Sequence, residues 1–158
     1  MHEGFVTALL WLLFGGTHIG LTAGPIRKPI VERYGEGVFV VGYSVVAMAT
    51  FAALTHYVAL HRFDQPQASL LVSIPPVRGG LLALSVFGFT SFVTAVLVYP
   101  RFPMATFRHR VTEARGVQQV TRHPFFSGIA LWAAAHALLA PSQVTFIYFV
   151  GIVVLSIV

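Results

Sequence analysis

The chain has 158 residues, of which 56% are hydrophobic and only 9% are charged, and its formal net charge is +5. Soluble domains carry about 25% charged residues, so this composition excludes an ordinary soluble domain and leaves room for one helical membrane bundle. The absence of cysteine excludes disulfides, iron–sulfur clusters and thiolate ligands. The basic residues flank apolar segments, a pattern typical of membrane topology and not of nucleic-acid binding.

Apolar runs separated by proline and glycine predict helices at about residues 4–23, 37–59, 79–99, 125–140 and 144–158. Four of these runs approach or exceed the roughly 20 residues that cross a bilayer. The last run is shorter, and we expect it to be a fifth helix truncated at the end of this chain. The predicted fold class is therefore all-α: a polytopic membrane bundle with five transmembrane segments, in a single integral membrane domain over residues 1–158.

Basic residues are unevenly distributed between the predicted loops. The loops after the first and third helices lie on one side of the membrane and hold eight Arg or Lys residues, whereas the loop after the second helix holds two. By the positive-inside rule the eight face the cytoplasm. The N-terminal residues lack the Lys or Arg that opens a signal peptide, so the first run is predicted to be retained. We expect a multi-pass protein of the bacterial inner membrane with its N-terminus outside.

Two histidines lie within predicted spans, His18 in the first and His136 in the fourth. Burying an ionisable side chain in a membrane is costly, so each is a candidate functional residue. At 1.5 Å per residue, His18 lies about 21 Å from the outer edge and His136 about 16 Å from the inner edge. In a core of about 30 Å their depths differ by roughly 7 Å, so the pair could flank one metal or planar cofactor.

A structural interpretation of the same residues remains open. A single intramembrane histidine can bond a backbone carbonyl, and small residues next to it are the usual means of helix packing in membranes. Gly15 lies one turn from His18, Gly88 lies in the third run, and an alanine stripe surrounds His136. The stripe consists of Ala133, Ala137 and Ala140. Trp132, one turn before His136, could stack on a cofactor or simply fill the helix interface.

The segment GVQQVTRHP at residues 116–124, followed by LWAAAH ending at His136, resembles the NnrU family. The resemblance runs from His18 through Arg27, Arg33 and Tyr43 to the end of the chain. That family includes bacterial membrane proteins associated with denitrification genes and the 15-cis-zeta-carotene isomerases. The isomerase branch implies haem b with histidine ligands, and the matching positions are His18 and His136. Whether this chain is an enzyme stays open; a haem-dependent isomerase is what that branch implies.

From the resemblance we expect an inner-membrane haem b protein, either redox-active or isomerase-like, or accessory to nitrogen-oxide metabolism. Arg27, Arg33 or Arg122 near the inner surface would pair with the haem propionates. His123 and Trp132 are further candidates for cofactor binding. Apart from the lipid bilayer, an apolar polyene or a small gaseous ligand would suit such a site. The sequence predicts no nucleic-acid partner and identifies no protein partner.

The Arg-His-Pro turn at residues 122–124 supports a second hypothesis. It also resembles membrane methyltransferases of the isoprenylcysteine and phospholipid type, whose pattern is completed here by Gly116, Phe126 and Gly128. This resemblance implies S-adenosylmethionine bound near the cytoplasmic surface, but it leaves the two intramembrane histidines unexplained. A third hypothesis, a non-catalytic structural membrane subunit, requires neither cofactor.

Overall fold

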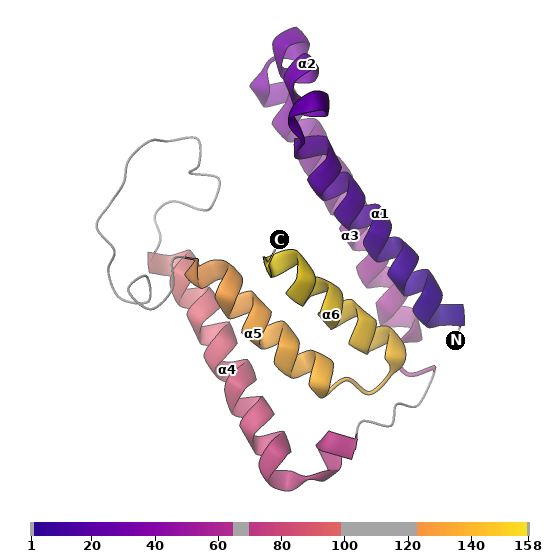
Figure 1. Cartoon of the computed structure of the whole chain (residues 1–158), viewed down its shortest axis with the longest axis vertical. Coiled ribbons are helices and arrows are strands. Elements are labelled where there is room, and N and C mark those ends of the chain that lie inside the picture. The colour runs from indigo at the N-terminus through magenta and orange to yellow at the C-terminus, as the bar shows by residue number, and fades with distance from the viewer. Residues whose placement is uncertain (1, 65–69, 99–122, 158) are drawn as a thin grey trace. The chain divides into compact units, whose positions relative to one another are not determined.

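A computed structural model shows a helical chain (Figure 1). The structure describes residues 2–64, 70–98 and 123–157, and within these ranges it has six α-helices, one short 3-10 helix and no strand. The elements in chain order are α1 (His2–Thr22), α2 (Gly24–Tyr34), α3 (Glu36–His61), η1 (Leu70–Ser73), α4 (Pro75–Val98), α5 (Pro124–Leu138) and α6 (Gln143–Ile157). The prediction of an all-α fold is confirmed.

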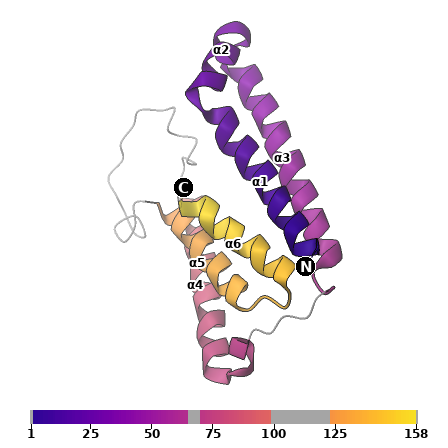
Figure 2. The ribbon, with the colours of Figure 1, turned by 45° about the vertical axis from the view of Figure 1, so that its right-hand side comes forward.

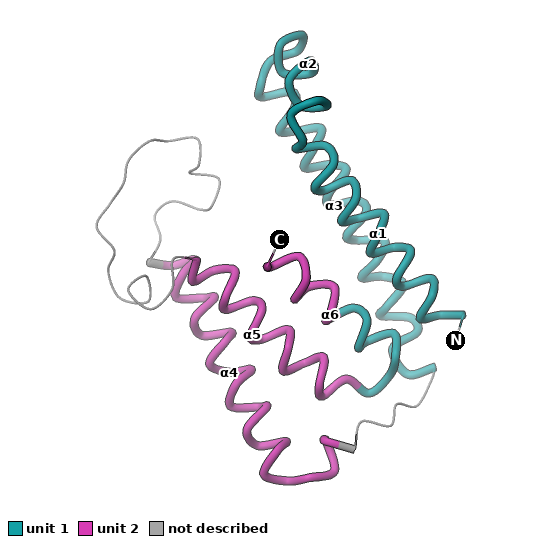
Figure 3. Tube along the Cα trace, in the orientation of Figure 1, with its two compact units in different colours: residues 1–67, 141–148 teal, residues 68–140, 149–158 magenta. Residues whose placement is uncertain are grey.

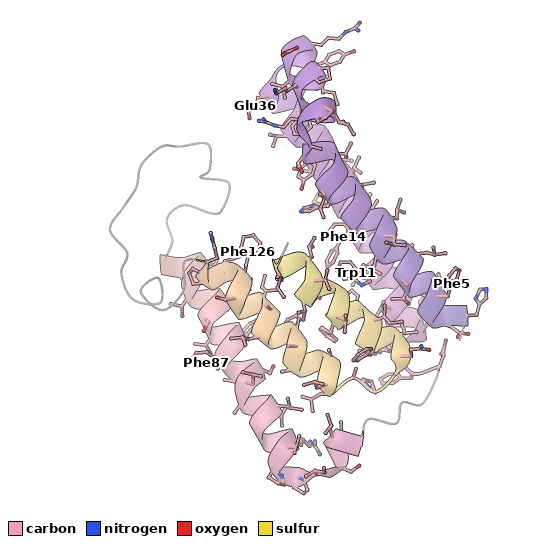
Figure 4. All side chains as sticks on the ribbon, in the orientation of Figure 1. Phe5, Trp11, Phe14, Glu36, Phe87 and Phe126 are labelled. Atoms are coloured by element: carbon pink, nitrogen blue, oxygen red, sulfur yellow. The ribbon has the colours of Figure 1, made fainter. Side chains whose placement is uncertain are left out.

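Three of the helices, α1, α3 and α4, are long and apolar enough to cross a membrane. Their surfaces are rich in exposed large apolar side chains, for example Phe5 on α1 and Phe87 on α4, which are 64% and 61% exposed (Figure 4). Such extensive apolar exposure is typical of a surface that meets lipid. The remaining apolar helices, α5 and α6, have 15 residues each, fewer than the roughly 20 of a typical span. The predicted number of five transmembrane segments is therefore not confirmed.

The segment between the first two predicted helices differs from the prediction, because it contains the additional helix α2. The pair Gly24 and Pro25 predicts an interruption of helical structure at this point. Pro25 instead occupies the first turn of α2, where its missing N–H has no intrahelical acceptor to lose. A second proline, Pro29, is tolerated inside the helix. The helix ends at Gly35, whose φ of 84° favours glycine and whose N–H donates to the carbonyl of Val31 at 2.9 Å.

The same property of proline shifts the start of α4. This helix begins at Pro75, four residues before the predicted start, because Pro75 and Pro76 form its first turn. The ends of the other predicted helices agree with the structure to within two residues. At both positions proline begins a helix and does not interrupt one.

The chain forms two compact units, coloured separately in Figure 3. Unit 1 contains residues 1–67 and 141–148, and unit 2 contains residues 68–140 and 149–158. In unit 1, α1 and α3 lie side by side, with α2 connecting them at one end (Figures 1 and 2). The buried centre of unit 1 consists of Leu54, Val58 and Val144, with Leu10, Trp11, Phe51 and Tyr148 packed against it.

In unit 2, α4 and α5 meet at two glycines, Gly88 and Gly128. A Cβ placed on Gly88 would lie 2.6 Å from the backbone nitrogen of Trp132 and 2.9 Å from the carbonyl oxygen of Gly128. A Cβ placed on Gly128 would lie 2.6 Å from the backbone nitrogen of Phe92. The two backbones are therefore in direct contact, which is the close approach that small residues allow in membrane helices.

Candidate functional site

His136 lies on α5 in unit 2, and a backbone carbonyl defines the role of one of its ring nitrogens. Its Nδ1 is 2.9 Å from the carbonyl oxygen of Trp132, one turn earlier, and 3.4 Å from Oγ of Ser85 on α4. Because a carbonyl can only accept, this contact assigns the proton to Nδ1. In a neutral imidazole the lone pair is then on Nε2.

Two aromatic rings pack against the His136 side chain. The Trp132 ring lies 4.5 Å from the imidazole and the Phe149 ring lies 4.9 Å from it, measured between centroids. Trp132 and Phe149 also contact each other edge to face, with centroids 5.4 Å apart. The predicted proximity of Trp132 to His136 is confirmed. The histidine is half-buried, so its ring is held by these neighbours without being fully enclosed.

His18 lies on α1 in unit 1, where its partner is the hydroxyl of Tyr43 on α3. The hydroxyl oxygen is 2.8 Å from Nδ1 and 3.1 Å from Nε2, so it faces the edge of the imidazole that carries both nitrogens. The Tyr43 and His18 ring centroids are 5.3 Å apart, and the ring of Phe14 lies 5.2 Å from that of His18. Figure 4 labels Phe14 and shows it on the same helix. A hydroxyl can both donate and accept, so this contact is compatible with either tautomer of His18.

Tyr43 is a site residue that no local sequence pattern indicates. It is 25 residues from His18, and no periodicity within one helix relates the two. The signal available was its place in the resemblance to the NnrU family. The ring of Tyr43 stacks on the buried Phe39 with centroids 6.0 Å apart, and the Arg27 guanidinium lies 5.7 Å from the Phe39 centroid. Arg27 is thereby connected to His18 through two aromatic rings.

The small residues near the two histidines differ in their surroundings. A Cβ placed on Gly15, one turn before His18, would meet no heavy atom within 4 Å in the part of the chain that the structure describes. By contrast, Ala133, Ala137 and Ala140 are at most 4% exposed. The alanine stripe therefore lies in the protein interior, as the packing interpretation predicts, whereas Gly15 makes no close helix contact with the described residues.

The predicted propionate partners occupy different surroundings. Arg27 lies on α2 and donates through Nη2 to Oε1 of Glu36 at 2.7 Å, in an ion pair that remains partly exposed. Arg33, also on α2, is exposed and lies 5.4 Å from the ring of Tyr34. Arg122 lies outside the described residues.

His123 is exposed and immediately precedes α5. Its carbonyl oxygen accepts from the backbone N–H of Ser127 at 2.9 Å and from the Ser127 hydroxyl at 3.0 Å. This residue therefore contributes its backbone to the start of α5. Among the residues described, no group of three or more His, Asp or Glu side chains could hold a metal ion. A histidine pair binding a metallo-cofactor is a different arrangement and requires only one nitrogen from each residue.

Comparison with known proteins identifies sequences similar to this chain. The sequence model of the NnrU protein family matches residues 6–158. A relative, the chloroplastic 15-cis-zeta-carotene isomerase of Zea mays, is 25% identical over 162 aligned positions, which cover 96% of this chain and 41% of the relative. The chain thus spans about two fifths of that relative's length. No solved structure matches the chain significantly. Because the family model covers nearly the whole chain, the protein belongs to the NnrU family.

Proposed function

We propose that this chain is an integral inner-membrane protein that binds one haem b through the imidazoles of His18 and His136. The observation that carries the proposal is the combination, at His136, of a hydrogen bond from Nδ1 to the carbonyl of Trp132 with two aromatic rings, those of Trp132 and Phe149, packed against the imidazole. Histidines that ligate metals usually donate their second ring N–H to a carbonyl or carboxylate, which fixes the tautomer and the ring orientation. His136 therefore has the protonation pattern that a ligand acting through Nε2 needs.

The donor chemistry of the chain fits a non-covalent haem. Two imidazoles are common axial ligands of haem iron, and the absence of cysteine excludes both thioether attachment and a thiolate ligand. Phe14 beside His18 and Phe149 beside His136 supply apolar ring surface next to each proposed ligand. When bound, the haem would supply one-electron redox chemistry and a site for small ligands at iron.

We also propose a topology in which all five apolar helices cross the membrane with the N-terminus outside, within a single domain of residues 1–158. The helices α5 and α6 would each extend about 22 Å at 1.5 Å per residue, which is shorter than a core of about 30 Å. A bilayer accommodates such a mismatch by local thinning at modest cost. The eight-to-two distribution of basic residues supports the orientation.

The activity we propose follows from the relative named a 15-cis-zeta-carotene isomerase, which aligns with 96% of this chain. By this similarity the chain would act on an apolar polyene within the membrane, with His18 and His136 as the residues that would hold the haem. An accessory role in nitrogen-oxide metabolism, through redox chemistry or binding of a small gaseous ligand, is the alternative within the same haem-binding proposal.

The test is the absorption spectrum of protein purified in detergent from haem-replete membranes. We expect a Soret band and, after reduction, the sharp bands of low-spin haem b. His18→Ala and His136→Ala should each remove the haem or convert it to a five-coordinate form that binds carbon monoxide readily. The matched control is His61→Ala on α3, where Nδ1 lies 2.8 Å from a backbone carbonyl, that of Tyr57, as in His136. A colourless protein, or a spectrum unaffected by both substitutions, would exclude the proposal.

A further inference from the structure

The short helix α2 is fixed by its two connections at one end of two candidate membrane spans. A single residue, Ala23, separates it from α1, and a single residue, Gly35, separates it from α3. The helix contacts both of its neighbours, and Figure 2 shows it at their shared end. Because α1 and α3 are long and apolar enough to cross a membrane, these connections hold α2 in the headgroup region where the two spans end.

The surface of α2 is open and combines charged with apolar side chains. None of its 11 residues is buried. Ile26 and Tyr34 are 44% and 57% exposed. Tyrosine is enriched where a membrane meets water, because its ring is apolar and its hydroxyl is polar. A short helix that exposes such side chains beside charged ones suits the boundary between lipid headgroups and acyl chains.

The protein neutralises only part of the positive charge on α2. Arg27 is paired with Glu36 at 2.7 Å. Lys28 and Arg33 are exposed, and within the described part of the chain neither forms an ion pair. The one acidic residue of α2, Glu32, is also exposed. Two basic side chains and one carboxylate therefore remain on the open surface of the helix, which leaves it with an excess of positive charge.

We infer that α2 binds anionic phospholipid headgroups through Lys28 and Arg33. A guanidinium can donate two parallel hydrogen bonds to a phosphate, and an ammonium group attracts it as a point charge. The Arg33 guanidinium lies 5.4 Å from the Tyr34 ring centroid, so charge and apolar ring are presented together. Attraction between basic residues and an anionic surface decays within about 8 Å at physiological ionic strength, and the tethered position of α2 satisfies this limit. The inference does not depend on haem binding.

The opposite end of unit 1 carries a similar pair in a different electrostatic environment. There the Arg62 guanidinium lies 4.9 Å from the ring centroid of Phe63, which is 71% exposed. Asp64 follows Arg62 by two residues, and Glu3 lies at the start of α1, which reaches the same end of the unit (Figures 1 and 2). Two carboxylates thus oppose the charge of Arg62, and we expect no preference for anionic lipid at this end.

The first experiment places a fluorescent reporter at each of these two ends. Tyr34→Trp and Phe63→Trp each add one indole beside an arginine, and both proteins keep the same two native tryptophans as background. The proteins are reconstituted in phosphatidylcholine vesicles that contain a minor fraction of brominated phosphatidylglycerol or brominated phosphatidylcholine. Bromine quenches the indole next to which the lipid lies.

We expect brominated phosphatidylglycerol to quench Tyr34→Trp more than brominated phosphatidylcholine does, because the positive charge of α2 enriches the anionic lipid. Phe63→Trp should be quenched no more by the anionic lipid than by the neutral one. Equal quenching of Tyr34→Trp by the two lipids would overturn the inference. So would the same anionic preference at both reporters.

Charge substitutions in the Tyr34→Trp protein test the residues themselves. Lys28→Gln and Arg33→Gln should each lower the association of phosphatidylglycerol relative to phosphatidylcholine by about fivefold, because each removes one positive charge near the headgroups. Glu32→Gln should raise the same ratio by a similar factor. Since misfolding would not produce this gain, Glu32→Gln keeps the test decisive where a basic variant folds poorly. A ratio unchanged in all three variants would contradict the assignment.

The same reporter distinguishes a lipid headgroup from a free anion. Sodium phosphate is compared with sodium chloride at equal ionic strength, so that both salts screen the surface charges to the same extent. We expect the two salts to reduce the preference for phosphatidylglycerol equally. If inorganic phosphate removes the preference at a concentration where chloride does not, α2 binds free phosphate and the assignment to lipid is wrong.

Discussion

Replacing Gly88 with alanine should destabilise unit 2, because the new methyl group would collide with the backbone of α5. The added Cβ would lie 2.6 Å from the nitrogen of Trp132 and 2.9 Å from the oxygen of Gly128. Backbone atoms cannot rotate away, so α4 and α5 would have to separate by roughly an ångström to restore ordinary contact distances. Overpacking of this kind costs about 1–3 kcal/mol of unfolding free energy.

The matched control is Gly80→Ala on the same helix, where a Cβ would meet no described heavy atom within 4 Å. There the only expected effect is the higher helix propensity of alanine, which stabilises by about 0.5–1 kcal/mol. The two substitutions are chemically identical and share the gain in helix propensity, so the difference between them, about 1–3 kcal/mol, reports the helix contact alone. Thermal or denaturant unfolding of the detergent-purified protein measures both.

Gly88→Ala/Gly128→Ala provides a further check on the same reasoning. Each Cβ would collide at one crossing point, since Gly88 faces the oxygen of Gly128 and Gly128 faces the oxygen of Gly88. Once the helices have separated to accommodate the first methyl group, the second has room. The double variant should therefore lose less unfolding free energy than the sum of the losses in the two single variants. A Gly88→Ala protein as stable as Gly80→Ala would refute the close contact of α4 and α5.

Three further predictions concern topology, cofactor and surface charge. Reporter fusions after Gly35 should report a cytoplasmic location and fusions after Gln67 a periplasmic location, because the basic residues are concentrated in the first and third loops. A cytoplasmic signal from the Gln67 fusion would contradict the predicted topology and the similar membrane depth of the two histidines. Isothermal titration should show no binding of S-adenosylmethionine, whereas saturable binding that Arg122→Ala abolishes would favour the methyltransferase hypothesis. Glu36→Gln should change the unfolding free energy by less than about 1 kcal/mol, because the ion pair of Glu36 with Arg27 is partly exposed. A larger loss of unfolding free energy at low salt would contradict this prediction.

The sequence predicted the features that depend on local order along one helix. Apolar runs located the helices, and the four-residue spacing of Trp132 and His136 placed their side chains together. The effect of proline was harder to predict from the sequence, because Pro25 lies in the first turn of a helix where an interruption was predicted. The rule that proline interrupts helices applies to their interiors and does not exclude the first turn.

Contacts between helices were harder to predict from the sequence, because they depend on the rotation and depth of each helix. Gly15 and Gly88 are the same residue type in similar apolar runs, yet in the described part of the chain a Cβ on Gly15 would meet nothing and one on Gly88 would meet backbone. Tyr43 reaches His18 from another helix, and the spacing of 25 residues has no period that would indicate it. Such pairs are set by tertiary packing, which a single sequence does not encode in any local pattern.

The buried cluster of unit 1 also has a consequence for biosynthesis. Leu54 and Val58 are synthesised early, whereas Val144, which belongs to the same buried cluster, follows Leu54 by 90 residues. At about 5–20 residues per second, roughly 5–18 s pass before the ribosome supplies Val144. For that interval Leu54 and Val58 lack Val144 as a packing partner, so the buried cluster of unit 1 is completed only when α6 is made.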